Sequence, residues 1–213
     1  DEEDLRRIVG DNKTDLKLSI MADVGKCDYE TDIAPKKESV IDLVRVACYI
    51  HQIPSAVEMI QDAHEKGYEV TANLMAVSTV HESDLDEGLQ VLAGTPVSAI
   101  YLVDSFGSFY SEEIRALTKK YLDACKGTNI QVGIHTHNNQ QLAYANTIEA
   151  IVSGANRLDA TLSGLGRGAG NCPLELLIGF LKNPRYKLRP TLDCIERHIE
   201  PLRRNMHWGF DLS

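Results

Sequence analysis

Apolar and polar positions along this 213-residue chain fall into two alternating patterns. Short runs rich in aliphatic and β-branched residues are typical of strands, and the stretches between them repeat apolar residues at helical spacing. Six strands are predicted, at residues 16–22, 41–50, 69–77, 98–104, 129–135 and 157–162. Their starts recur about every 25 to 30 residues, the size of a strand–helix–strand crossover, so the strands are predicted to be parallel.

Helices are predicted in the intervals between these strands. Residues 1–10 are typical of the last turns of a helix, and helical spacing recurs at 55–67, 82–94, 111–127, 140–154 and 191–207. A further helix is opened by Pro173, because proline is favoured in a first turn. Ser111 is the predicted N-cap of its helix, and Gly127 is the predicted C-terminal stop.

This order of elements is typical of a doubly wound sheet or of a barrel. A dinucleotide-binding sheet carries its glycine-rich loop after the first strand, whereas the run GLGRGAGN follows the last strand here. We therefore predict an α/β fold, a TIM (β/α)8 barrel of which this chain holds six strands.

Composition narrows the class of protein. A chain of this length with 43% hydrophobic residues buries one sizeable core, and its net charge of −9 argues against a nucleic-acid or anionic-membrane partner. No apolar run reaches the roughly 18 residues of a membrane span, and the start DEEDLRRIVGDN is acidic, so a cytoplasmic location is predicted. The five cysteines form no C-x-x-C pair, which indicates reduced thiols.

The run NIQVGIHTHNN at 129–139 carries the strongest chemical signal. Side chains two apart on a strand share a face, so His135 and His137 are predicted to converge at the end of this strand, where α/β proteins place their chemistry. Two imidazoles that face one space suit a divalent metal. The alternative is a pair of hydrogen-bonded or surface histidines.

Polar residues near other strand ends are the predicted substrate-binding set. They are Ser105, Arg45, Asp104, Asn73 and Thr161. Arg45 lies within a strand, so it is expected to pair with Asp23, Asp104 or a substrate, and a structural ion pair is the favoured interpretation. For Ser105 the alternative is a turn hydrogen bond, and for Asn73 and Thr161 it is hydrogen bonding within the core.

Four motifs in a fixed order carry a family resemblance: H-x-H-x-N, A-N-x-I, R-x-D-A-x-L and G-x-G-x-G-A-G-N-x-P-L-E. This part of the chain resembles the last two strand–helix units of the DRE-TIM metallolyase superfamily, which includes HMGL-like lyases and pyruvate carboxyltransferase domains. The run YLVDSFGSF resembles the sixth-strand end of 4-hydroxy-2-oxovalerate aldolases, the nearest likeness within that superfamily.

The resemblance implies a chemistry. His135, His137 and Asn171 would bind Mn²⁺ or Mg²⁺, or Co²⁺, and the ion would stabilise a pyruvate enolate while a 4-hydroxy-2-oxo acid is cleaved. Ser105 would bind the substrate carboxylate. Asn171 has an equal alternative as the N-cap of the helix at Pro173. A condensing synthase of the isopropylmalate or citramalate type and a catalytically silent barrel module remain open.

The chain also departs from the superfamily pattern. The first strand of the family ends in an Asp-Arg-Asp/Glu motif, which supplies a carboxylate ligand and a catalytic arginine, and nothing here matches it. We therefore expect residues 1–213 to hold strands three to eight of a longer protein and to lack full activity alone. A homo-oligomer and an aldehyde dehydrogenase partner are further implications of the resemblance. Cys172 does not match the catalytic cysteine of hydroxymethylglutaryl-CoA lyases in register, so a packing role is predicted.

Overall fold

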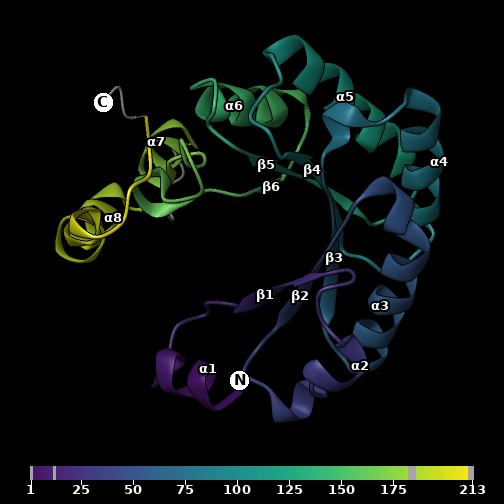
Figure 1. Cartoon of the computed structure of the whole chain (residues 1–213), viewed down its shortest axis with the longest axis horizontal. Coiled ribbons are helices and arrows are strands. Elements are labelled where there is room, and N and C mark those ends of the chain that lie inside the picture. The colour runs from purple at the N-terminus through teal and green to yellow at the C-terminus, as the bar shows by residue number, and fades with distance from the viewer. Residues whose placement is uncertain (1, 12, 182–185, 211–213) are drawn as a thin grey trace.

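One parallel sheet of six strands organises the chain (Figure 1). The computed structural model describes residues 2–11, 13–181 and 186–210. The strands are hydrogen-bonded in sequence order and run β1 (Ser19–Asp23), β2 (Leu43–Cys48), β3 (Glu69–Leu74), β4 (Ala99–Asp104), β5 (Gln131–Thr136) and β6 (Arg157–Leu158). All six predicted strands are confirmed, with narrower bounds. The last is two residues long, so strand alternation ends at Leu158.

The helices lie in the predicted intervals. They are α1 (Glu2–Val9), α2 (Tyr29–Asp32), α3 (Ile53–Glu65), α4 (Glu82–Ala93), α5 (Ser111–Ala124), α6 (Ala143–Ser153), α7 (Leu174–Leu181) and α8 (Leu188–Cys194). In Figure 1, α3 to α6 follow one another around the outer side of the curved sheet. The segment after α8 first widens into a π-helix at Ile195–Ile199 and then tightens into a 3₁₀-helix at Glu200–Arg204. No helix in the described ranges is long and apolar enough to span a membrane.

The start of α5 differs from the prediction by one residue. Tyr110 is the N-cap, and its backbone N–H is accepted by the Glu113 side chain at 2.9 Å. Ser111 is the first helical residue, and its hydroxyl bonds with Asn146 of α6 instead. Beyond the helix, Gly127 has a φ of +82°, a conformation that favours glycine and fits the predicted stop.

The sheet has an apolar outer face and a polar inner face. Fully buried residues such as Val44, Val46, Leu102 and Ile134 pack beneath the helices. The strand register places the inner-face residues in rows, one of which contains Met21, Arg45, Thr71 and their neighbours on the later strands. Strands of barrels bury such a second face inside the barrel.

Two ion pairs across the inner face show that the sheet is strongly curved. Arg45 of β2 pairs with Asp159 just after β6 at 2.5 Å, and Glu69 of β3 pairs with Arg157 of β6 at 2.7 Å. In a flat sheet, β2 and β6 would lie about 19 Å apart at the usual strand spacing. A direct contact therefore requires the sheet to curl, and the predicted partial (β/α)8 barrel is confirmed.

Candidate active site

A cavity of about 410 Å³ opens at the carboxyl ends of the strands. It lies where parallel α/β barrels carry their active sites, because the loops that follow successive strands meet there. The residues that line it come from or follow β1 to β5, with one from the glycine-rich loop: Met21, Asp23, Lys26, Ala47, Tyr49, Asn73, Met75, Ala76, Val103, Ser105, Phe106, His135, His137 and Arg167.

His135 and His137 both line this cavity. Their ring centroids are 5.1 Å apart with an interplanar angle of 70°. The alternation of β5 produces this arrangement, since Val132 and Ile134 of the same strand are buried beneath the helices. The two rings therefore converge as predicted, and because Nδ1 of His135 contacts Asp159 the alternative of hydrogen-bonded histidines stays open beside the metal site.

Asp159 fixes the orientation of His135. Its Oδ2 lies 2.9 Å from Nδ1 of His135 and also accepts a hydrogen bond from Arg45. Although burial opposes the charged form of Asp159, the contacts with His135 and Arg45 outweigh it and lower the pKa of this carboxyl. An ionised acceptor selects the imidazole tautomer with its proton on Nδ1, so Nε2 of His135 is left as a free electron-pair donor.

His137 is held neutral. Burial, with additional contributions from His135 and Arg167, lowers the pKa of His137 to about 4. An uncharged imidazole is the form that binds a metal ion. The ring therefore needs no deprotonation at neutral pH before it acts as a ligand.

Asn171 lies beside His137 because the two backbones form an antiparallel bridge. Its side-chain nitrogen donates to the carbonyl oxygen of Leu165 at 3.3 Å. Its Oδ1 is buried and, among the described residues, has no hydrogen-bond partner. A Cβ at Gly166 would lie 2.7 Å from this amide, so the glycine-rich loop makes room for it.

These residues fit part of a divalent-cation site. His135 offers a ring nitrogen, and Asn171 has a buried amide oxygen to which no described residue donates, which is costly unless a ligand satisfies it. Within residues 2–11, 13–181 and 186–210, no three His, Cys, Asp or Glu side chains form a metal cluster. Two imidazoles and one amide therefore need further ligands, such as a carboxylate and water, to complete a coordination sphere.

One wall of the cavity suits an anion. Oγ of Ser105 accepts the backbone N–H of Ala76 at 2.9 Å, so its hydroxyl proton remains for a ligand. Arg167 bonds with the carbonyl oxygen of Ser105 at 3.4 Å and brings a positive charge to the cavity. Asn73 also lines the cavity, as its parity predicts, and its buried Oδ1 has no partner in the described part of the chain.

Three predicted substrate residues lie elsewhere. Arg45 forms the expected ion pair, but with Asp159 rather than Asp23 or Asp104, because the curled sheet brings β2 to β6. Asp104 shares the outer face of Ile100 and Leu102, and its carboxylate accepts the N–H of Ser108. Thr161 is outside the cavity because alternation stops when β6 ends at Leu158.

Asp159 is the functional candidate that the sequence analysis missed. It shares the inner-face parity of Arg157, whose register with Gly133 is fixed by β5. The R-x-D-A-x-L motif therefore contained a signal, since its Arg and Asp are two residues apart. Cys172 is buried against Ala143 and Leu177, as the predicted packing role requires, and all five cysteines are free thiols.

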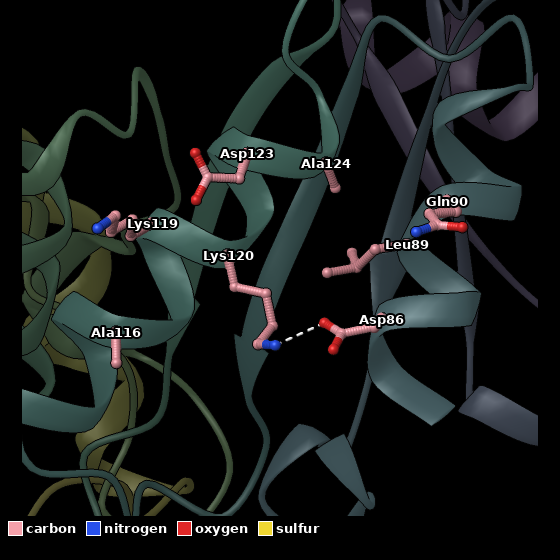
Figure 2. A pocket seen from close by; sticks show the side chains of 8 residues that line it. All are labelled: Asp86, Leu89, Gln90, Ala116, Lys119, Lys120, Asp123 and Ala124. Atoms are coloured by element: carbon pink, nitrogen blue, oxygen red, sulfur yellow. Dashed lines mark hydrogen bonds and ion pairs between the residues drawn. The ribbon is translucent and has the colours of Figure 1, made fainter. Parts of the chain in front are cut away.

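A larger hollow of about 490 Å³ lies away from the strand ends, between α4 and α5 (Figure 2). Lys120 projects across it and forms ion pairs with Asp86 at 2.5 Å and Glu82 at 3.0 Å. These contacts join two neighbouring helices. No predicted site residue lines this hollow, so it is part of the helix packing.

Several known proteins are similar to this chain in sequence. The chain is 35% identical over 164 residues to 4-hydroxy-2-oxovalerate aldolase from Bacillus cereus, which covers 75% of the chain and 47% of the relative. It is 33% identical over 156 residues to oxaloacetate decarboxylase from Mycobacterium tuberculosis, covering 73% and 45%. The chain thus spans about half the length of the curated relatives it matches.

A solved structure extends the likeness in fold. Hydroxymethylglutaryl-CoA lyase from Pseudomonas aeruginosa superposes with a TM-score of 0.71 at 16% identity, covering 93% of this chain and 73% of the lyase. A sequence profile of the HMGL-like family matches residues 45–197, a range that includes both histidines, Asp159 and Asn171. This chain belongs to the HMGL-like family.

Proposed function

We propose that the protein containing this chain is a divalent-metal-dependent carbon–carbon lyase that releases pyruvate from a 4-hydroxy-2-oxo acid. The observation that carries the proposal is the convergence of His135 and His137 at one cavity, next to the segment of Asn171, whose buried Oδ1 has no hydrogen-bond partner among the described residues. Support also comes from the relatives, because one of them is named 4-hydroxy-2-oxovalerate aldolase.

Cleavage of such a substrate breaks the C3–C4 bond. The 4-hydroxyl loses its proton and becomes the carbonyl of an aldehyde, while the electron pair of the broken bond passes to C3 and forms an enolate that is then protonated to pyruvate. A cation held by His135, His137 and Asn171 would act as a Lewis acid and lower the energy of this enolate.

The remaining residues of the cavity orient the substrate. The hydroxyl of Ser105 is free to donate to a carboxylate, since its oxygen already accepts from Ala76. Arg167 adds a positive charge on the same side. A charge-assisted hydrogen bond of this kind fixes both the position and the sign of the bound group. The substrate carboxylate therefore faces Ser105, and the adjacent 2-oxo carbonyl faces the histidines.

Decarboxylation of oxaloacetate is the second candidate. It is favoured by the relative from Mycobacterium tuberculosis, which is named oxaloacetate decarboxylase and is almost as similar as the aldolase. Both reactions break a bond to C3 of the same pyruvate unit and leave the same enolate. They differ only in the leaving group, an aldehyde or carbon dioxide.

The test uses the full-length gene product supplied with Mn²⁺. Pyruvate release is measured with 4-hydroxy-2-oxovalerate and with oxaloacetate, and acetyl-CoA consumption is measured to detect a synthase. We expect aldehyde and pyruvate in equal amounts, with activity reduced at least about 100-fold in His135→Ala and in His137→Ala. Full activity of both variants, or of enzyme stripped by a chelator, would reject the metal-dependent lyase. Inactivity on every substrate would favour a silent module.

A homo-oligomer, an aldehyde dehydrogenase partner and a cytoplasmic location remain predictions of the sequence. The same applies to the expectation that residues 1–213 form a partial barrel domain whose first two strands and C-terminal remainder belong to a longer chain.

A further inference from the structure

A line of contacts crosses the interior of the barrel and ends at His135. Asp159 Oδ2 lies 2.9 Å from Nδ1 of His135 and 2.5 Å from a guanidinium nitrogen of Arg45. Side-chain exposure is 22% for His135 and 16% for both Asp159 and Arg45. The three groups are thus largely withdrawn from water, where hydrogen-bond geometry is held tightly.

The aromatic ring of Tyr101 packs against Arg45 and holds it in place. Its guanidinium carbon lies 4.4 Å from the centroid of the Tyr101 ring, within the range of a cation–π contact. Tyr101 in turn lies over Gly133, where a Cβ would come within 2.4 Å of the ring. Gly133 precedes His135 on the same inner face of β5, so the absence of a side chain there creates the space that this packing uses.

We infer that Asp159 is a positioning residue that presents Nε2 of His135 to a divalent cation, and that Arg45 holds Asp159 in place. This inference rests on the proposed metal-dependent function. A carboxylate that accepts the Nδ1 proton fixes both the tautomer and the ring orientation of a metal-binding histidine. Arg45 prevents the carboxylate from turning away, because it donates to the same oxygen that contacts His135.

Replacement of Asp159 by asparagine tests this role with little change in shape. The amide is neutral, and its NH₂ group can donate to Nδ1 of His135, which favours the opposite tautomer with the proton on Nε2. We expect the affinity for Mn²⁺ to fall by about 10- to 100-fold, the usual effect of losing such a partner. Isothermal titration of Mn²⁺ into the full-length protein measures this change.

Glu69→Gln is the matched control. Glu69 forms the other ion pair across the barrel interior, with Arg157, but neither residue lines the cavity that holds the histidines. The Glu69→Gln substitution removes a similar ion pair from the same fold. It should therefore lower the free energy of unfolding without changing the Mn²⁺ affinity. Equal weakening of Mn²⁺ binding by Asp159→Asn and Glu69→Gln would overturn the positioning role.

A second readout does not depend on metal. Long-range ¹H–¹⁵N spectra of metal-free protein at mildly alkaline pH report the tautomer of each neutral histidine, and His135→Ala assigns the signal. We expect the Nδ1–H form of His135 in the wild type and in Glu69→Gln, and a shift toward Nε2–H in Asp159→Asn. An unchanged tautomer in Asp159→Asn would overturn the inference. Failure of the wild-type protein to bind Mn²⁺ would instead reject the metal centre of the proposed function. The tautomer of His135 would still show whether Asp159 orients the ring.

Discussion

The ring of Tyr101 occupies the space that a side chain at position 133 would fill. An ideal Cβ on Gly133 would lie 2.4 Å from Cδ1 of Tyr101, closer than such contacts allow. The two residues are direct neighbours in the register of β4 and β5, and their pairing supports Arg45 beneath the candidate site. This glycine is therefore required by packing rather than by an unusual backbone angle.

Gly133→Ala is expected to destabilise the fold by about 1 to 3 kcal/mol, because the added methyl group displaces a ring in a packed interior. Urea unfolding measures this change. Gly179 in α7 is the matched control, since a Cβ there would meet no atom of the described residues within 4 Å. Alanine at position 179 should leave stability unchanged or raise it by up to about 1 kcal/mol. Equal stability of Gly133→Ala and wild type would contradict the packing argument.

Ser105→Ala tests the anion-binding wall. Loss of the hydroxyl removes a donor for the substrate carboxylate, so KM for the 2-oxo acid should rise about tenfold, as expected for one hydrogen bond to a charged group, with a smaller change in kcat. Steady-state kinetics of the full-length enzyme provide the measurement. Ser108→Ala serves as the control, because Ser108 bonds with Asp104 through its backbone N–H. A KM that responds equally to both changes would argue against carboxylate binding at Ser105.

The sequence predicted the histidine pair correctly because strand alternation depends only on local backbone geometry. Ile130, Val132 and Ile134 specify which face of the strand is apolar, and His135 must then occupy the other face. The same rule, applied to Ile100 and Leu102, would have placed Asp104 beneath the helices, where the structure has it. The inclusion of Asp104 in the site followed from its position at a strand end alone.

The partner of Arg45 was beyond a sequence-based argument. Asp159 lies 114 residues away along the chain, and only the curvature of the whole sheet brings β2 to β6. Thr161 lies outside the cavity for a different reason, since its predicted direction assumed a strand that continues past Leu158. Local periodicity thus predicts which face a residue occupies, but neither the length of a short strand nor a contact across a closed interior.

Asn171→Ala is expected to weaken Mn²⁺ binding at least about tenfold, or about 1.4 kcal/mol. The reason is that Oδ1 of Asn171 is buried without a hydrogen-bond partner in the described structure, on a backbone segment that is bridged to His137. Calorimetric titration of the full-length protein tests this value against Asn139→Ala, whose side chain bonds with the carbonyl oxygen of Phe106 instead. Unaltered affinity in Asn171→Ala would leave the loop amide with a purely structural role.

Glu69→Gln should reduce the extent to which the free energy of unfolding falls as the pH drops below 4.5. Burial disfavours the charge on Glu69, but hydrogen bonds from Ser98, Arg157 and Lys17 outweigh it and lower the pKa of Glu69 to about 2. Because the unfolded chain takes up this proton near pH 4.5, wild-type stability should fall as pH drops from 4.5 toward 2, by up to about 1.4 kcal/mol per pH unit from this group. Well above pH 4.5, Glu69 does not make the free energy of unfolding depend on pH. Urea unfolding at several pH values measures both curves, and parallel curves for the two proteins would show that folding does not lower the pKa of Glu69.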